Sequence, residues 1–342
     1  MATSRRWPWI SASIWFHTVS APWSLSIDSG SIARIAKSAS IVPTRLTFVD
    51  IAGLVRGASK GEGLGNQFLA NIREVDAIAH VLRCFEDDDI THVEGRIDPT
   101  ADADVVETEL MLADLDSLER RIAPLEKKAK SGEKEAKAQV ALMEKALVLL
   151  RDGKPARLAD ISEDEEQEWK KLQLLTSKPV LYVCNVDEAS AAAGNDFSRA
   201  VAARAEAEGA AFVVISAKIE AELAQLDDEE AAEYLESLEL EEPGLNRLIH
   251  SGYKLLGLQT YFTVGPKEAR AWTIREGWTA PQAAGVIHGD FEKGFIRAET
   301  IAYDDFIANG GESGAKEAGK MRQEGKEYVV KEGDVLHFRF NV

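Results

Sequence analysis

The chain has 342 residues, of which 45% are hydrophobic and 29% are charged, and its formal net charge at pH 7 is −18. This length is enough for two or three domains with a core each, whereas the negative charge disfavours broad binding to nucleic acid, so DNA is not an expected partner. The sequence contains no run of about 18 apolar residues that could span a membrane, and its histidines lack the spacing of zinc ligands. Its two cysteines, Cys84 and Cys184, lie at the ends of apolar runs and favour a reduced, cytoplasmic protein.

Residues 1–31 differ in composition from the rest of the chain. They hold four of the seven tryptophans, are rich in serine and contain one acidic residue, Asp28. The pair Arg5-Arg6 before the apolar residues 7–16 resembles a secretory signal, and the lack of acids resembles a transit peptide. Pro8, Ser11 and Ser13 interrupt the apolar run, which disfavours a signal peptide. Because a phosphate-binding loop is also missing from the chain, we expect instead that these residues come from a shifted reading frame or a wrong start.

Residues 46–66 combine a predicted strand, an acidic strand end and a glycine-rich loop. The β-prone residues 46–49 lead to Asp50, Gly53 follows three positions later, and a helix is predicted over 64–73. A carboxylate at a strand tip beside a glycine N–H is how nucleoside triphosphatases sense a γ-phosphate and its Mg²⁺. The pattern therefore predicts the phosphate side of a nucleotide site.

Residues 48–73 resemble switch II of the YchF/Obg-like ATPase family, and the resemblance extends over residues 32–342. It implies that Asp50 contacts Mg²⁺ through water and that Gly53 senses the γ-phosphate. Leu54 stands where many GTPases carry a glutamine that orients the attacking water. The resemblance therefore implies that water is positioned in another way or that hydrolysis is slow.

The phosphate-binding loop with which that family begins is missing from this sequence. No complete G-x-x-x-x-G-K-[ST] string occurs, although the backbone N–H groups and the lysine of such a loop hold the phosphates. The nearest match, residues 314–320, is followed by Met321 where the loop carries the hydroxyl that binds Mg²⁺. We therefore expect a G domain without its first strand, weak nucleotide binding and impaired hydrolysis.

The next residues predict an α/β domain with an inserted helical hairpin. A strand predicted over 77–84 after the helix gives a β-α-β order, which implies parallel strands. Apolar residues then recur at spacings of four and three on both sides of Ser131-Gly132, as in two antiparallel helices. These residues are Met111, Leu115, Leu118, Ile122, Leu125, Ala136, Val140, Met143, Leu147 and Leu150.

Five lysines surround the turn of this hairpin, namely Lys127, Lys128, Lys130, Lys134 and Lys137. They are either an ordinary solvated helix face or the basic tip of an arm that meets RNA or a ribosomal surface. The resemblance to the coiled-coil insertion of the family favours the second interpretation.

An apolar strand predicted over 178–184 ends in Asn185-Val186-Asp187-Glu188. GTPases carry N-K-x-D here, and its aspartate accepts hydrogen bonds from two N–H groups of guanine. Asn185 and Glu188 match the ends of that motif, and Val186 replaces the lysine. This variant resembles that of the YchF family and implies ATP rather than GTP. Because Asp187 precedes Glu188, the sequence leaves open which carboxylate faces the base.

A further strand, predicted over 211–215, ends in Ser216-Ala217-Lys218, which resembles the loop that offers N–H groups to the base in these enzymes. From residue 258 the pattern changes to short strands, as in the TGS domain, a β-grasp module. These strands are predicted at 260–264, 271–273, 300–303, 328–330 and 335–340, with a hairpin turn at 331–334.

Together these patterns predict an α/β fold, a P-loop-type G domain with a parallel sheet that lacks its first strand, an inserted helical hairpin and a C-terminal β-grasp (TGS) domain. The predicted segments are 1–31 for the unmatched N-terminal part, 32–104 and 176–257 for the G domain, 105–175 for the hairpin, and 258–342 for the β-grasp domain.

The resemblance implies a cytoplasmic, ribosome-associated ATPase that binds ATP, uses Mg²⁺ and meets ribosomal RNA or the ribosome, as large subunit or 70S particle. Its base site would consist of Asn185, Val186, Glu188, Ser216, Ala217 and Lys218. The alternative is a non-enzymatic module that docks on RNA or the ribosome through the hairpin and the β-grasp domain. A redox role of Cys84 or Cys184 stays open.

Overall fold

The structure, a computed structural model, describes residues 29–49, 64–87 and 96–341. The chain forms two compact units. The first contains the described residues 49, 64–87 and 96–248, and the second contains 29–48 and 249–341. In the part of the chain that is described, no helix is both long and apolar enough to cross a bilayer.

Helices and strands alternate in the first unit. In chain order they are α2 (Leu64–Glu74), β2 (Ile78–Arg83), α3 (Pro99–Lys130), α4 (Lys134–Arg151), the 3-10 helix η2 (Ala156–Leu158), α5 (Glu166–Lys171), β3 (Val180–Asn185), the 3-10 helix η3 (Glu188–Ser190), α6 (Asp196–Glu208), β4 (Ala211–Ile215), α7 (Ala217–Leu223) and α8 (Asp228–Ser237). The boundary to the second unit falls inside α9 (Gly244–Leu255).

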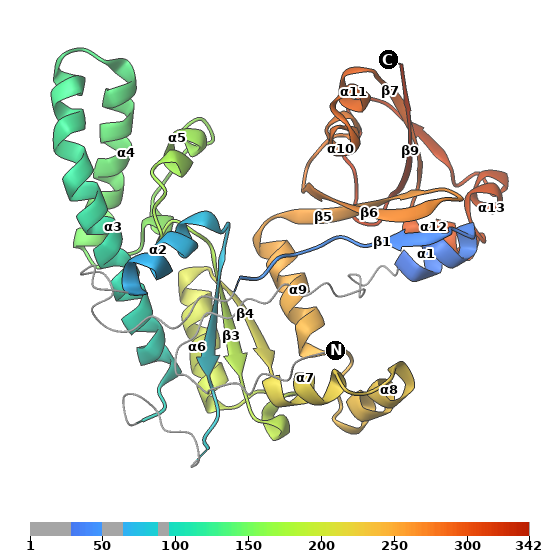
Figure 1. The fold of residues 1–342 in the computed structure, drawn as a ribbon, viewed down its shortest axis with the longest axis horizontal. Coiled ribbons are helices and arrows are strands. Elements are labelled where there is room, and N and C mark those ends of the chain that lie inside the picture. The colour runs from blue at the N-terminus through green and yellow to red at the C-terminus, as the bar shows by residue number, and fades with distance from the viewer. Residues whose placement is uncertain (1–28, 50–63, 88–95, 342) are drawn as a thin grey trace. The chain divides into compact units, whose positions relative to one another are not determined.

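A parallel sheet in the order β2-β3-β4 is the centre of the first unit. Ile78 lies opposite Val180, and Leu181 lies opposite Ala211. Helix α6 packs on β3 and β4, and α3 packs on β2 (Figure 1). Because β3 is covered by its neighbours, its residues from Val180 to Cys184 are all buried. The predicted parallel sheet is confirmed.

The predicted hairpin is formed by α3 and α4, which lie side by side (Figure 1). Asp98 caps the start of helix α3, since its Oδ1 accepts a hydrogen bond from the Ala101 N–H at 3.0 Å. The turn contains Gly132 at φ 101°, a backbone conformation that favours glycine. Eight of the ten predicted stripe residues form one core, all except Ala136 and Val140, with Leu118, Met143, Leu147 and Leu150 buried in it.

The second unit contains two helix-covered parts of one sheet. Its elements are α1 (Ser29–Ala36), β1 (Ser40–Val42), β5 (Leu258–Val264), β6 (Glu268–Arg275), α10 (Ala280–Ile287), α11 (Gly289–Lys293), β7 (Phe295–Ile301), α12 (Tyr303–Ala308), α13 (Glu312–Glu317), β8 (Arg322–Glu324) and β9 (Val335–Phe340), and the strand order is β1-β6-β5-β9-β7-β8.

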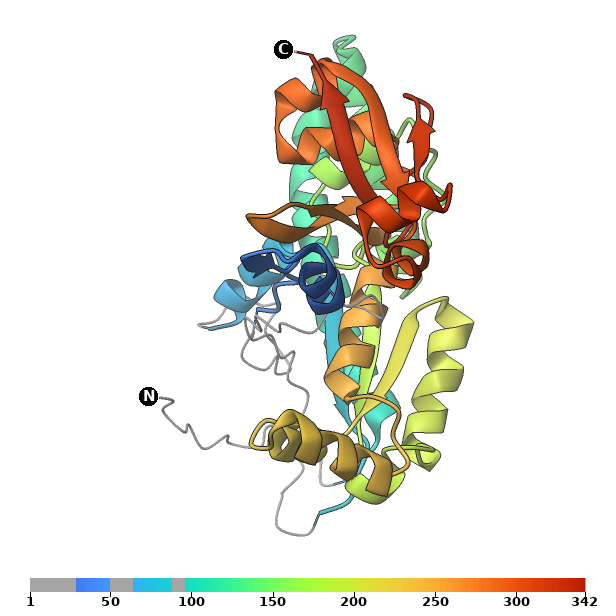
Figure 2. The ribbon, with the colours of Figure 1, turned by 90° about the vertical axis from the view of Figure 1, so that its right-hand side faces the viewer.

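Successive side chains of a strand point to opposite faces of the sheet. Neighbouring residues of β5 therefore pack in two different hydrophobic cores of this unit. Tyr261 packs in a cluster with Phe338 and residues of α10, and its hydroxyl donates to the Ala283 carbonyl at 2.9 Å. Phe262 packs in another cluster with Ile32 of α1 and residues of α12. Figure 2 shows α1 in blue beside the orange strands of the sheet.

Residues 32–48 differ from the predicted domain boundary, which assigned them to the G domain. They lie in the second unit, where β1 pairs in parallel with β6 and Ser40 lies opposite Glu268. Ile32 is fully buried there. The three residues of β1 and the few apolar residues of α1 carry no local signal for pairing with β6, which lies more than 200 residues further along the chain. The sequence pattern therefore did not predict this pairing.

Three predicted strands are corrected by the structure. Residues 46–49 form no strand, because no described segment pairs with them and a strand exists only within a ladder. The strand predicted at 300–303 is the end of β7, and α12 begins at Tyr303. Residues 328–330 contribute one isolated bridge, between Val329 and Thr279.

Candidate functional site

Two loops meet at the carboxyl-terminal edge of the parallel sheet. Asn185 is the last residue of β3, and Ser216 follows the last residue of β4. The Asn185 Oδ1 accepts a hydrogen bond from the Ala217 N–H at 2.9 Å. The Val186 N–H donates to the Ile215 carbonyl, also at 2.9 Å. The sheet therefore brings the two predicted base-binding motifs together, at the edge where open α/β sheets bind ligands.

The adjacent carboxylates of Asp187 and Glu188 have different partners. Asp187 caps η3, since its Oδ1 accepts from the Ser190 N–H at 2.9 Å and its Oδ2 from the Ser190 hydroxyl at 3.2 Å. The Oε1 of Glu188 instead lies 2.5 Å from the Nζ of Lys218 on the other loop, and this contact raises the pKa of Lys218. Glu188 is thus the carboxylate at the loop junction.

Two further residues of the predicted site are buried at this junction. Val186 and Ser216 are each 2% exposed, whereas Ala217 and Lys218 are exposed. The Ser216 hydroxyl has no hydrogen-bond partner among the described residues. Leaving a buried hydroxyl unpaired costs about 1–3 kcal/mol, so a polar partner from solvent or from a ligand is favoured here.

Asn195 connects β2 to the same edge. It caps α6, with its Oδ1 accepting from the Ser198 N–H at 3.0 Å, and its Nδ2 donates to the Cys84 carbonyl at 2.6 Å. The Cys84 N–H in turn donates to the Asn185 carbonyl at 2.8 Å. Asparagine followed three residues later by serine indicates a helix start, but nothing in the sequence predicted the contact with Cys84.

The two cysteines lie below the loops and are both fully buried. A hydrogen bond to Cys184, followed by burial, raises the pKa of the Cys84 thiol. The reactive thiolate form is therefore disfavoured.

The predicted phosphate-sensing residues, Asp50 and Gly53, lie outside the described residues, as do all but three residues of the segment 1–31. Within the described ranges, no group of three or more His, Cys, Asp or Glu side chains is arranged to hold a metal ion. The described part of the site is therefore the part next to Asn185 and Ser216.

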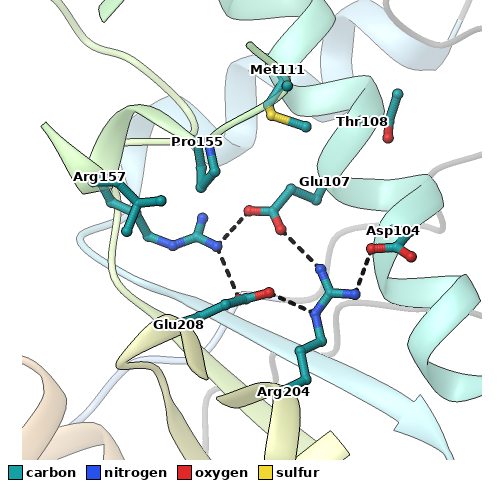
Figure 3. A pocket seen from close by; sticks show the side chains of 10 residues that line it. Asp104, Glu107, Thr108, Met111, Pro155, Arg157, Arg204 and Glu208 are labelled. Atoms are coloured by element: carbon teal, nitrogen blue, oxygen red, sulfur yellow. Dashed lines mark hydrogen bonds and ion pairs between the residues drawn. The ribbon is translucent and has the colours of Figure 1, made fainter. Parts of the chain in front are cut away.

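A separate pocket of about 310 Å³ lies at the root of the hairpin, between residues of α3, η2 and α6 (Figure 3). Four of its side chains form a closed ring of alternating charge, which we call the root ring. Arg157 Nη2 contacts Glu107 Oε1 at 2.5 Å and Glu208 Oε2 at 3.3 Å. Arg204 completes the ring, with Nη2 at 3.1 Å from Glu107 Oε2 and Nε at 2.8 Å from Glu208 Oε1.

The root ring joins the hairpin to the α/β sheet. Its side chains are only 12–22% exposed. The Tyr182 hydroxyl of β3 donates to Glu208 at 2.8 Å, and burial raises the pKa of Tyr182 to about 12. Because each charge of the ring is balanced by its neighbours, the pocket serves as a structural junction. The sequence did not predict the root ring, since its members come from three segments far apart in the chain.

Comparisons with known families cover both units. A family described as "50S ribosome-binding GTPase" matches residues 31–103, and the YchF-GTPase C-terminal family, described as "Protein of unknown function (DUF933)", matches residues 258–341.

Similar curated proteins match most of the chain. The "Ribosome-binding ATPase YchF" of Pasteurella multocida is 59% identical over 311 residues, which are 91% of this chain and 85% of that protein. The protein of the same name from Bacillus subtilis is 53% identical over 303 residues, with 88% and 83% covered.

Solved structures give a consistent result. The YchF GTPase of Schizosaccharomyces pombe is 38% identical, with a TM-score of 0.78 over 91% of this chain and 84% of that one. A GTP binding protein from Pyrococcus horikoshii shares the fold at 18% identity, with a TM-score of 0.52 over 80% of this chain and 81% of that one.

Proposed function

This chain belongs to the YchF family, and we propose that it is a cytoplasmic, ribosome-associated ATPase of that family. The curated relatives whose names state this function are 59% and 53% identical to the chain and match 91% and 88% of it. The observation that carries the proposal is the hydrogen bond between Asn185 and Ala217, which joins the two loops of a base site at the ligand-binding edge of the sheet.

In this proposal the junction of the two loops holds the base of ATP. Val186 cannot flank the ring as the lysine of GTPases does, and the buried Ser216 hydroxyl offers a free hydrogen-bonding group. The exposed start of α7 offers backbone N–H groups. The residues of this base site are Asn185, Val186, Glu188, Ser216, Ala217 and Lys218.

Asp50 and Gly53 are proposed to contact the phosphate side, Asp50 through a water molecule on Mg²⁺. A magnesium ion bound with the phosphates would neutralise part of their charge. Because the sequence has no complete phosphate-loop string, we propose that this chain binds ATP weakly and hydrolyses it slowly. The N–H groups of such a loop otherwise supply much of the phosphate affinity.

The hairpin tip is proposed to meet ribosomal RNA. Lys127, Lys128, Lys130, Lys134 and Lys137 are all exposed, and none forms an ion pair with a described residue. Lysines of this kind neutralise phosphates and release counterions, which favours binding at low salt. On a chain with a net charge of −18, such a cluster supports a local contact with RNA.

A nucleotide-binding measurement tests the proposal. We expect a fluorescent ATP analogue to bind the full chain, with turnover slow or absent, and Asn185→Ala to weaken binding at least about tenfold because the two loops separate. Asn309→Ala, in the second unit, is the matched control and leaves binding unchanged. Rapid ATP turnover would contradict slow hydrolysis, and equal binding by Asn185→Ala would contradict the base site.

A non-enzymatic module that docks on the ribosome is the second candidate, supported by the missing phosphate-loop string. Sedimentation with 70S ribosomes distinguishes it from the ATPase. The module predicts that the chain sediments with ribosomes while ATP and its analogue fail to bind at millimolar concentration.

A further inference from the structure

We propose that Lys178 is a positioning residue for the phosphate side of the nucleotide site, because it holds the end of helix α2 in place and thereby favours a nucleoside triphosphate over a diphosphate. This inference rests on the proposed function, in which Asp50 and Gly53 contact the phosphates. It concerns the number of phosphates that the chain recognises, and it assigns to Lys178 a role that is exerted through α2.

The ammonium group of Lys178 caps the end of α2. Its Nζ donates a hydrogen bond to the Arg73 carbonyl at 3.1 Å and a second one to the Val75 carbonyl. The last carbonyl groups of a helix have no partner within the helix, and a cation at that end also complements the helix dipole. The side chain of Lys178 is half-buried, so these bonds lie partly out of water. Lys178 therefore fixes the point at which α2 ends.

The segment that leads into β3 is itself held by the hairpin. The N–H groups of Leu175 and Thr176 both donate to the Asp114 carboxylate of α3 at 2.8 Å. Arg121, further along α3, donates from Nη1 to the Leu172 carbonyl at 2.9 Å. Because several hydrogen bonds join this segment to α3, the lysine at its end projects from a fixed backbone. The end of α2 is thus tied to the root of the hairpin.

Helix α2 connects this fixed end to the phosphate side. It begins at Leu64, shortly after Gly53 in the chain, and its Leu69 and Ile72 are buried. A short helix is stiff, so a fixed end restricts the positions that its start and the residues before it can take. Less conformational freedom is then lost when Asp50 and Gly53 contact a γ-phosphate, which favours the bound state.

Lys178 does not act by touching the nucleotide in this proposal. It precedes β3, whereas Asn185 is the last residue of that strand, so the two lie at opposite edges of the sheet. A diphosphate lacks the γ-phosphate that Gly53 is proposed to sense, and its binding therefore does not depend on where α2 is held. Loss of Lys178 is expected to weaken the binding of a triphosphate selectively.

Competition between nucleotides measures this effect. Unlabelled ADP and β,γ-imido-ATP, which resists hydrolysis, displace a fluorescent ADP analogue from the full chain in excess Mg²⁺, and the ratio of their dissociation constants is the readout. Lys178→Met keeps an apolar side chain of similar length but donates no hydrogen bond. We expect it to shift the ratio about fivefold against the triphosphate, the equivalent of one hydrogen bond. Both nucleotides are measured on the same preparation, so a lower folded fraction cancels in the ratio.

Two further variants separate this mechanism from a general effect of charge. Lys178→Arg retains a cation that donates to carbonyl groups, and it keeps the ratio of the parent. Lys170→Met is the matched control, since it removes an exposed lysine that pairs with Glu166 one turn away on α5, and it leaves the ratio unchanged. Urea denaturation of each variant measures its stability separately.

The outcomes distinguish this inference from the proposed function. Lower stability of Lys178→Met with an unchanged ratio, while both nucleotides still bind, overturns the positioning role and leaves the nucleotide site standing. An equal shift in Lys170→Met also overturns it, because charge rather than the tie to α2 would then govern the ratio. Failure of the unmodified chain to bind either nucleotide at millimolar concentration overturns both the inference and the proposed function.

Discussion

Basic side chains lie at both ends of the helical hairpin, but in opposite situations. At the root, Arg157 and Arg204 are 12% and 15% exposed, and each pairs with at least two carboxylates. At the tip, the lysines are exposed and form no ion pair with a described residue. Paired charges stabilise the junction of the hairpin, whereas unpaired charges remain available to a partner.

The largest expected effect comes from Asp114, a second anchor of the hairpin root that is 1% exposed. Its carboxylate accepts from the Leu175 N–H and the Thr176 N–H, both at 2.8 Å, and from the Thr176 hydroxyl at 2.7 Å. Asp114→Ala leaves these donors buried and unpaired, and we expect a loss of about 4 kcal/mol in the free energy of unfolding. Urea denaturation monitored by circular dichroism measures it.

Asp116→Ala is the control for this substitution on the same helix. Asp116 is 58% exposed in its side chain, and among the described residues it pairs only with Arg120 one turn away, so its loss changes stability by less than about 0.5 kcal/mol. Equal effects of the two substitutions would contradict the assignment of Asp114 as an anchor.

His80 gives the root a pH dependence that the tip lacks. It is 5% exposed, and the centre of its imidazole lies 6.0 Å from the centre of the Tyr182 side-chain ring. The Tyr182 hydroxyl donates a hydrogen bond to Glu208 of the root ring. Burial, followed by the charge of Arg204, lowers the pKa of His80 from 6.5 to about 4.

The unfolded chain takes up a proton as the pH falls through 6.5, whereas the folded chain does so only near pH 4. Stability is therefore lost between these values, by about 3 kcal/mol for this residue. We expect His80→Gln to lose correspondingly less stability than the parent in urea denaturation between about pH 7 and pH 4. The exposed His288→Gln serves as control, and a parallel loss in all three proteins would refute the prediction.

The smallest effect on stability is expected at the tip. Replacing Lys127, Lys128 and Lys130 by alanine changes the free energy of unfolding by less than about 0.5 kcal/mol, because no ion pair is lost. The same triple variant weakens binding to 70S ribosomes and lowers the slope of log affinity against log salt by about 2 to 3. Fluorescence anisotropy across a salt series measures this slope.

A variant with the same change in charge tests whether position matters. Lys145, Lys170 and Lys171 are also exposed but pair with Glu165, Glu166 and Glu168, respectively. Their replacement by alanine leaves the salt slope nearly unchanged if the tip is the RNA contact. An equal loss of affinity would show that overall charge, rather than the tip, governs binding.

The sequence predicted the elements whose signals are local. Periodic apolar residues indicated α3 and α4, and apolar runs before polar loops indicated β3 and β4 with the motifs at their ends. These signals suffice because side-chain spacing follows directly from helix and strand geometry.

Long-range pairings were not predictable in the same way. A motif such as N-x-x-E does not show that Glu188 forms an ion pair with Lys218 or that Asp187 accepts a hydrogen bond from the Ser190 N–H. The root ring likewise joins Glu107, Arg157 and Glu208 across about a hundred residues. Each depends on which charged neighbour the fold brings near, and any of the many charges of this chain could have served.

The pairing of β1 with β6 makes the chain visit its second unit twice. A fragment that begins at residue 258, where the C-terminal family match starts, would lack helix α1 with Ile32. The apolar surface around Phe262 would then be exposed to solvent. Within the described residues, the polypeptide passes between the units twice, after Phe48 and after Leu248, so one proteolytic cut between the units would not release either of them. Each unit therefore consists of separate segments of the chain, and neither can be produced as one contiguous fragment.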